Sequence, residues 1–184
     1  MHDGICVSAI AAVAQNGVVG LNGKLPWRIA SDLKFFRRTT LRHAVIMGRK
    51  TLDEIESPLK RRFNIVLSRS LEREEPRLLV VRDLQQALAA AAEHERKQVA
   101  AGKVEQAEIL VIGGPSIWQL AWPDVDRFYR TEVHRDFEGD VRFPAVDLAG
   151  FTETSRVVGE GDVPHTFTTL ERIVSGRERG DSLG

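Results

Sequence analysis

The chain has 184 residues, of which 42% are hydrophobic, and this length suits one folded domain with a single core. Its 26 basic residues balance its 26 acidic residues, so the overall charge gives no reason to expect nucleic acid or an anionic membrane as a partner. Any anion-binding site must therefore be local.

Cysteine and histidine usage narrows the class further. Cys6 is the single cysteine and cannot form an internal disulfide, which suits a reducing cytoplasm. The five histidines form no spaced pair with another histidine or cysteine, so we expect no metal site. The apolar N-terminal stretch lacks a preceding basic region and is shorter than the roughly 20 residues needed to span a bilayer, so we interpret it as a strand. We expect residues 1–174 to form a monomeric cytoplasmic domain and residues 175–184 a disordered tail.

The order of apolar segments predicts the fold class. Apolar runs bounded by turn residues predict buried strands at 5–14, 44–47, 63–68, 78–82 and 109–112. Helical periodicity appears between them at 32–41, 51–56, 84–101 and 116–121. This alternation predicts an α/β domain with a mainly parallel sheet, in which the Ala-rich helix at 84–101 lies on the surface with a solvated charged face. Three β-rich segments without intervening helices then predict an antiparallel edge at 127–134, 151–158 and 166–174.

One predicted strand leads through a glycine and two cations into a helix. This order places Gly48, Arg49, Lys50 and Thr51 at a helix N-terminus, where free amides and the helix dipole favour an anion. An ordinary solvated turn would have the same composition. Arg69, however, follows the next strand, and neighbouring parallel strands end at the same edge of a sheet. We therefore predict a phosphate site at this edge.

Paired glycines join the predicted strand at 109–112 to the following helix. Gly113 and Gly114 allow the backbone to approach a ligand where a Cβ atom would block it. Pro115 and Ser116 follow directly, so the segment is not the dinucleotide-binding pattern G-x-G-x-x-G. A plain tight turn is the alternative interpretation.

Asp32 lies in the first turn of the first predicted helix, after a loop that contains glycine and proline. A carboxylate there commonly caps a helix, and Ser31 could do the same. Here Trp27, Phe35 and Phe36 provide large apolar neighbours in the sequence. In an apolar cleft a carboxyl group has a raised pKa and offers two acceptors to an amino-pyrimidine edge. We predict that Asp32 is the one buried carboxylate of the chain and part of an active site.

Taken together, the motifs resemble the dihydrofolate reductase family. The segments LPW, SDLKFF, VIMGRKT, SPLKRRFNIVLSRS, VIGG and FEGDVRFP follow one another with the order and spacing of that family across residues 5–174. The resemblance implies an eight-stranded, mainly parallel sheet flanked by helices, with NADPH along the strand ends and folate in the adjoining cleft. It also implies hydride transfer to C6 of 7,8-dihydrofolate with protonation at N5, giving tetrahydrofolate for one-carbon metabolism, and binding of antifolate-like small molecules.

The resemblance assigns residues to the substrate. Asp32 looks like the family's pterin-binding acid, Thr131 like the threonine that supports it, and Arg62 like the partner of the substrate's α-carboxylate. Leu25 and Trp27 fall in a loop, residues 22–27, that closes over the nicotinamide. The substrate set implied is Ile10, Ala12, Asp32, Leu33, Phe36, Ile55, Leu59, Arg62, Ile112 and Thr131.

A second set is implied for the cofactor, with Arg49 and Arg69 as the partners of the 2′-phosphate and a cis peptide between the paired glycines. The set is Ala12, Val19, Gly20, Gly48, Arg49, Lys50, Thr51, Leu67, Ser68, Arg69, Ile112, Gly113, Gly114 and Trp118. Trp118 stands where the family most often has tyrosine. It is expected to contact the nicotinamide through its ring face, and the alternative is a core tryptophan.

Two other functions fit parts of the pattern. A reductase of similar fold could act on a ribosylated pyrimidine in riboflavin synthesis, although Arg62 and the D-L-x-x-F helix suit a glutamate-tailed pterin. A non-catalytic pterin- or NADPH-binding protein could keep the pocket without turnover, although the presence of both Asp32 and Thr131 argues against it.

Overall fold

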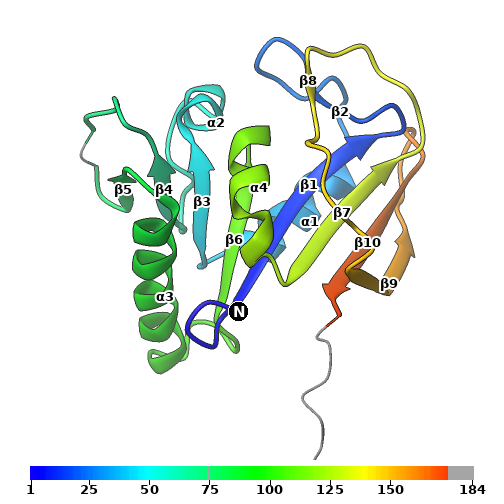
Figure 1. Ribbon diagram of the computed structural model, residues 1–184. Helices are drawn as coiled ribbons and strands as arrows, with labels where there is room; N and C mark the ends of the chain where they lie inside the picture. Colours follow the sequence, from blue (N-terminus) through cyan, green and yellow to red (C-terminus); the bar gives the residue numbers. More distant parts are fainter. Residues whose placement is uncertain (74, 174–184) are drawn as a thin grey trace, which may run out of the picture.

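The computed structural model describes residues 1–73 and 75–173, which form an eight-stranded sheet with helices on both faces (Figure 1). The strand order is β5-β4-β3-β6-β1-β7-β10-β9. The strands are β1 (Cys6–Ala14), β3 (Ala44–Gly48), β4 (Phe63–Leu67), β5 (Leu78–Val81), β6 (Glu108–Gly113), β7 (Arg127–Val133), β9 (Phe151–Val158) and β10 (His165–Arg172). All pairs from β5 to β7 are parallel, and β10 runs antiparallel to β7 and β9. The predicted α/β class with an antiparallel edge is confirmed.

The helices divide between the two faces of the sheet. On one face, α3 (Leu84–Ala100) and α4 (Pro115–Ala121) pack on side chains such as Val7, Ile46 and Ile109. On the other, α1 (Ala30–Thr40) and α2 (Arg49–Glu54) pack on Ile10 and Met47 and their neighbours. The alternation of side chains along each strand makes both faces apolar, which explains why the strands read as continuous hydrophobic runs.

Three short elements were not predicted. They are β2 (Val18–Gly20), β8 (Val141–Arg142) and the 3-10 helix η1 (Trp122–Asp124). The first two form a separate two-stranded antiparallel sheet beside the carboxyl end of β1 (Figure 1). Strands of two or three residues are too short to show a period in the sequence.

Helix α2 begins at Arg49, two residues before the predicted start. Gly48 has extended backbone (φ −86°, ψ 165°) and is the residue at which the strand ends and the helix begins. The prediction started at Thr51 because the two cations carry no apolar periodicity. No helix among residues 1–73 and 75–173 is long and apolar enough to cross a membrane. The predicted disordered tail lies outside the described residues.

The expectation of one buried carboxylate is wrong. Glu95 on α3 is fully buried, so the charged end of this helix is not entirely a solvated face. Glu95 accepts hydrogen bonds from the backbone N–H of Ala44 (2.6 Å) and Glu108 (3.3 Å), and its Oε2 lies 2.9 Å from Nδ1 of His43. These contacts join α3 to the amino ends of β3 and β6, at residues 51 and 13 positions from Glu95 in the sequence. No local pattern could have indicated them.

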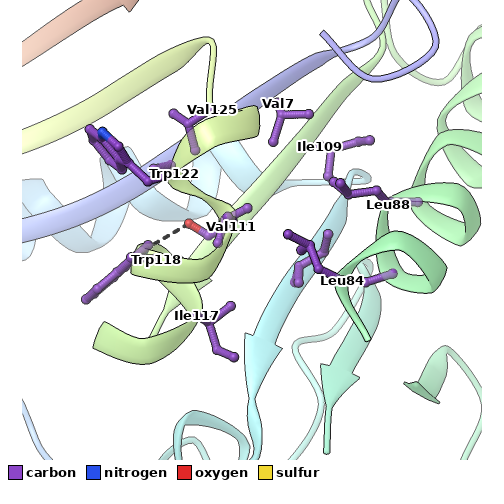
Figure 2. Packing of buried hydrophobic residues seen from close by; sticks show 14 of the residues in the cluster. Val7, Leu84, Leu88, Ile109, Val111, Ile117, Trp118, Trp122 and Val125 are labelled. Atoms are coloured by element: carbon purple, nitrogen blue, oxygen red, sulfur yellow. Dashed lines mark hydrogen bonds between the residues drawn. The ribbon is translucent and has the colours of Figure 1, made fainter. Parts of the chain in front are cut away.

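Trp118 anchors α4 to the sheet. Its indole Nε1–H donates to the carbonyl of Val111 at 3.2 Å (Figure 2). Its ring centroid lies 5.1 Å from that of Phe143. Only 7% of the residue is exposed. It belongs to the same apolar cluster as Ile117 and Trp122, and Figure 2 shows it on the side of α4 that faces away from α3.

Candidate functional site

Three neighbouring parallel strands end together at one edge of the sheet. Gly48 of β3 lies opposite Leu67 of β4, and Met47 lies opposite Gly113 of β6. This register brings the segments that follow the three strands side by side, although 65 residues separate the first glycine from the last in the sequence. The edge is where α/β sheets collect their ligands.

Arg49 and the segment after β4 meet at this edge, as predicted. Arg49 donates to the hydroxyl of Ser70 (3.3 Å) and forms an exposed ion pair with Asp53 (3.6 Å). Arg69, next to Ser70, is exposed. Both guanidiniums are therefore at the surface, with aqueous access for an anion.

A pocket of about 550 Å³ opens beside these cations. Ser68 and Arg69 line it, together with Arg73 and Arg82, and one acidic residue, Glu72. Arg82 was missed by the sequence interpretation. It directly follows β5, the neighbour of β4, so its position at the end of a parallel strand was the available signal.

Gly113 and Gly114 are joined by a cis peptide bond, which confirms the expectation for this pair. Gly113 has φ +120°, and a Cβ atom there would lie 2.9 Å from the ring of Trp118. Glycine is therefore required at this position by both backbone conformation and close approach. On the other side of the pair, a Cβ atom on Gly114 would lie 3.5 Å from the Thr51 hydroxyl, so Thr51 borders the glycines.

Asp32 lies at the start of α1 against the carboxyl end of β7. Only 7% of the residue is exposed, and its Oδ1 accepts a hydrogen bond from the Thr131 hydroxyl at 2.7 Å. Burial raises the pKa of Asp32, and the Thr131 hydrogen bond and the nearby charge of His165 act in the opposite direction. The predicted pair of Asp32 and Thr131, 99 residues apart, is thus brought into direct contact.

Most of the predicted substrate residues gather on the same face of the sheet as α1. Ile10 and Ile112 are buried there, and Phe36, Ile55 and Leu59 pack against them. Ala12 is opposite Thr131 in the pairing of β1 with β7. Leu33 is 40% exposed on α1 and lies outside the packed cluster.

Trp27 and Leu25 occupy different environments within the predicted loop. Trp27 is 8% exposed and packs edge-on against Phe137 (5.0 Å) and near Ala12. Its Nε1–H is buried without a hydrogen-bond partner among the described residues, so a donor is available beside the substrate face. Leu25 is 46% exposed.

The start of this loop is fastened to the segment before β8. Asn22 N–H donates to a carboxylate oxygen of Asp140 (3.1 Å), and Asp140 N–H donates to the Gly20 carbonyl (3.1 Å). Asp140 was not among the predicted site residues. Its only sequence signal was its place in the FEGDVRFP motif.

Arg62 is held by its neighbours rather than by an acid. Its guanidinium donates to the Thr40 hydroxyl (3.0 Å) and to the carbonyls of Lys60 (2.8 Å) and Arg37 (2.7 Å). Partial burial and the charges of Arg37 and Arg61 lower its pKa.

Two of the predicted cofactor residues, Val19 and Trp118, lie away from the α1 face. Both pack into the core on the α3 and α4 face of the sheet.

Comparison with known proteins identifies relatives of this chain. The family model described as dihydrofolate reductase matches residues 6–172. A dihydrofolate reductase type A13 from Escherichia coli is 34% identical over 92% of this chain and 96% of its own length, and a dihydrofolate reductase from Bacillus subtilis is 34% identical over 88% and 89%. The solved structure of dihydrofolate reductase from Enterococcus faecalis complexed with NADP(H) and RAB-propyl has a TM-score of 0.81 and 30% identity, covering 92% of this chain and 97% of that one.

The fold and the strand-end site define an α/β enzyme of the nucleotide-dependent reductase class. Within that class, the chain belongs to the dihydrofolate reductase family. The resemblance found in the sequence is thereby confirmed.

Proposed function

We propose that this chain reduces 7,8-dihydrofolate to 5,6,7,8-tetrahydrofolate with NADPH, and that the pterin binds against Asp32 on the α1 face of the sheet. The observation that carries the proposal is the environment of Asp32. It is a buried carboxylate that accepts one side-chain hydrogen bond among the described residues, from Thr131, and so keeps acceptor capacity for a ligand.

Asp32 holds the substrate and favours its protonated form. The carboxylate accepts hydrogen bonds from N3 and the 2-amino group of the pterin, while Thr131 fixes the other side of the carboxylate. Its negative charge favours a proton at N5, although the proton itself arrives on a water admitted by the Leu25 loop. Trp27 offers its free indole N–H to the same region.

NADPH, when bound, supplies the hydride that is added to C6. The residues present fit this cofactor because cations are concentrated where its phosphates would lie. Arg49 and Lys50 begin the helix after β3, and Arg69 follows β4, so three cations lie at the carboxyl ends of two paired strands in a chain whose total charge is zero. Arg49, Lys50 and Arg69 would hold the phosphates. Arg82 is added to this set because it lines the same pocket as Arg69.

The rest of the cofactor lies along the strand ends in this proposal. Gly113 and Gly114 let it approach the sheet, and Thr51 and Ser68 offer hydroxyls. Val19, Gly20, Leu67 and Ala12 form apolar and backbone walls. Trp118 acts mainly by fixing Gly113, since its ring is buried and its N–H is already bonded to Val111.

Arg62 binds the α-carboxylate of the substrate's glutamate. Thr40 and two backbone carbonyls hold the guanidinium in place without neutralising it, so its charge stays available to an anion. The apolar side chains of Phe36, Ile55 and Leu59 lie between this end and the pterin end, with Leu33 at the exposed margin. We also propose that the enzyme acts as a cytoplasmic monomer.

The direct test is the fall in absorbance at 340 nm when the full chain is mixed with NADPH and dihydrofolate. The expected result is turnover with dihydrofolate and none with a ribosylated aminopyrimidine, the substrate type of the similar reductase. Tight binding of NADPH and dihydrofolate without turnover would overturn the proposal in favour of a binding protein.

A further inference from the structure

His165, the first residue of β10, is a buried titratable group that the proposed mechanism does not use. It is 1% exposed. Phe167 lies opposite Thr131 in the sheet, and His165 precedes it by two residues, so His165 lies on the same face as Thr131 and Asp32. Its ring stands edge-on to Phe167 (5.1 Å), which packs against Phe35 of α1 (4.8 Å).

Both ring nitrogens of His165 are in hydrogen-bond contact. Nδ1 lies 2.7 Å from the carbonyl of Val163, and Nε2 lies 2.8 Å from the hydroxyl of Ser31. The Ser31 hydroxyl also lies 2.9 Å from the carbonyl of Glu160. Ser31 is the residue before Asp32, so this network joins the turn between β9 and β10 to the first turn of α1.

Counting protons shows which form of the imidazole completes the network. The two carbonyls only accept, and the three contacts together need three donated protons. A neutral His165 and the Ser31 hydroxyl supply two. An imidazolium and the same hydroxyl supply three, so the protonated ring satisfies every contact at once.

The turn closes directly on the ring. A Cβ atom at Gly159 would overlap Nε2 of His165, so glycine is needed there for the backbone to pass. Gly159 N–H donates to the His165 carbonyl at 2.9 Å. The imidazole is therefore enclosed between this backbone, Phe167 and Ser31, with little freedom to turn.

Helix α1 depends on this external contact. The residue at its N-cap, Ile29, makes no side-chain capping bond. Ser31 therefore provides a side-chain tether for the first turn, on which Asp32 also lies. The positive charge of His165 is among the influences that lower the pKa of Asp32, against the larger effect of burial.

We propose that His165 is a positioning residue for Asp32: it fixes the first turn of α1 through Ser31, and its imidazolium form completes that tether. The inference rests on the role of Asp32 proposed above. Asp32 on α1 is the buried titratable group beside the ring. Of the other titratable groups on the elements around it, His134 after β7 and Glu160 and Asp162 in the turn are exposed. Tyr129, Arg130 and Glu132 of β7 are partly buried, and Tyr129 lies on the same face of the sheet as Thr131.

The test follows the carboxyl of Asp32 by carbon NMR in the full chain without ligands. His165→Gln is expected to raise the pH at which Asp32 titrates, because it removes both the tether to the first turn of α1 and a nearby charge that lowers the pKa of Asp32.

Further variants separate positioning from general structure. Ser31→Ala should also raise the pH at which Asp32 titrates, since it removes the hydroxyl that links His165 to the first turn of α1. Asp162→Asn, which changes an exposed acid in the same turn, should leave the titration of Asp32 unchanged. In His165→Gln the KM for dihydrofolate rises while the Kd for NADPH stays at the wild-type value.

An unchanged Asp32 titration in Ser31→Ala overturns the inference. This variant removes a single hydroxyl, so the result stands even if His165→Gln fails to fold. Absence of dihydrofolate turnover in the wild type would instead defeat the proposed function, and the titration of Asp32 would still be measurable.

Discussion

Asp32 and Glu95 are both buried carboxylates, yet they lie at opposite ends of the parallel strands and are bonded very differently. Glu95, at the amino ends of β3 and β6, is fully buried and has two backbone N–H donors and His43 as partners. Asp32, beside the carboxyl end of β7, accepts one hydroxyl and is 7% exposed. One carboxylate is saturated by the fold, and the other is left with unused acceptor capacity.

The number of hydrogen bonds that the chain itself donates to a buried carboxylate distinguishes a structural acid from a functional one. A buried carboxylate costs free energy unless hydrogen bonds replace the lost water. At Glu95 the chain supplies those bonds itself, which stabilises the joint between α3 and the sheet. At Asp32 the compensation is incomplete, and a ligand with an amino-pyrimidine edge can complete it.

The largest expected effect is on catalysis by Asp32→Asn. Asparagine keeps the shape but has neither the charge nor the second acceptor, so hydride transfer at neutral pH should slow by about 10² to 10⁴-fold. The rate of the variant should climb as the pH falls, because substrate protonated in solution bypasses the missing charge. Stopped-flow measurement of the step across pH checks this. Near wild-type rates at pH 7 would return Asp32 to the role of a helix cap.

Glu95→Gln should affect stability rather than the chemical step. The amide can accept at one atom only, which leaves a buried N–H of the Ala44 and Glu108 pair without a partner. We expect the free energy of unfolding to fall by about 2 kcal/mol, measured by urea denaturation. Glu93→Gln is the matched control on the same helix, since Glu93 is exposed and should change stability little. A loss of hydride transfer without a loss of stability would contradict the distinction between the two acids.

The exposed arginines at the carboxyl ends of the strands differ from both buried acids, because water reaches them in the free protein. Arg49→Ala and Arg69→Ala should each reduce the preference for NADPH over NADH by about tenfold, because each removes one charge-assisted bond to the 2′-phosphate. The ratio of kcat/KM for the two cofactors measures this, with Arg96→Ala on α3 as a control away from the edge. Unchanged ratios in both variants would show that the 2′-phosphate does not bind at this edge.

The smallest effect is a gain in stability in Asp32→Asn. Burial raises the pKa of Asp32 in the folded state above its unfolded value, so the ionised form opposes folding. That cost is absent below the unfolded pKa and fully present above the folded pKa. The variant should therefore be more stable than wild type at neutral pH, by about 1 kcal/mol, and the difference should vanish in acid. Equal unfolding midpoints at all pH values would mean that the fold already compensates the charge.

The alternation of strands and helices could be predicted from the amino-acid sequence, because apolar runs and helical periods are local. The position of the cations at the strand ends could also be predicted. Gly48 and Arg49 follow one predicted strand, Arg69 follows the next, and the two strands were expected to be parallel neighbours. The family followed from ordered motifs, and the comparisons confirm it.

The tertiary structure decided which polar groups meet. Glu95 lies on a helix whose sequence looks solvated, and only the packing of α3 on β3 and β6 shows that its carboxylate is enclosed. His165 and Ser31 are 134 residues apart, and Arg82 reaches the pocket of Arg69 only because β5 pairs with β4. Burial and hydrogen bonding depend on contacts distant in the chain, and a local pattern carries no record of them.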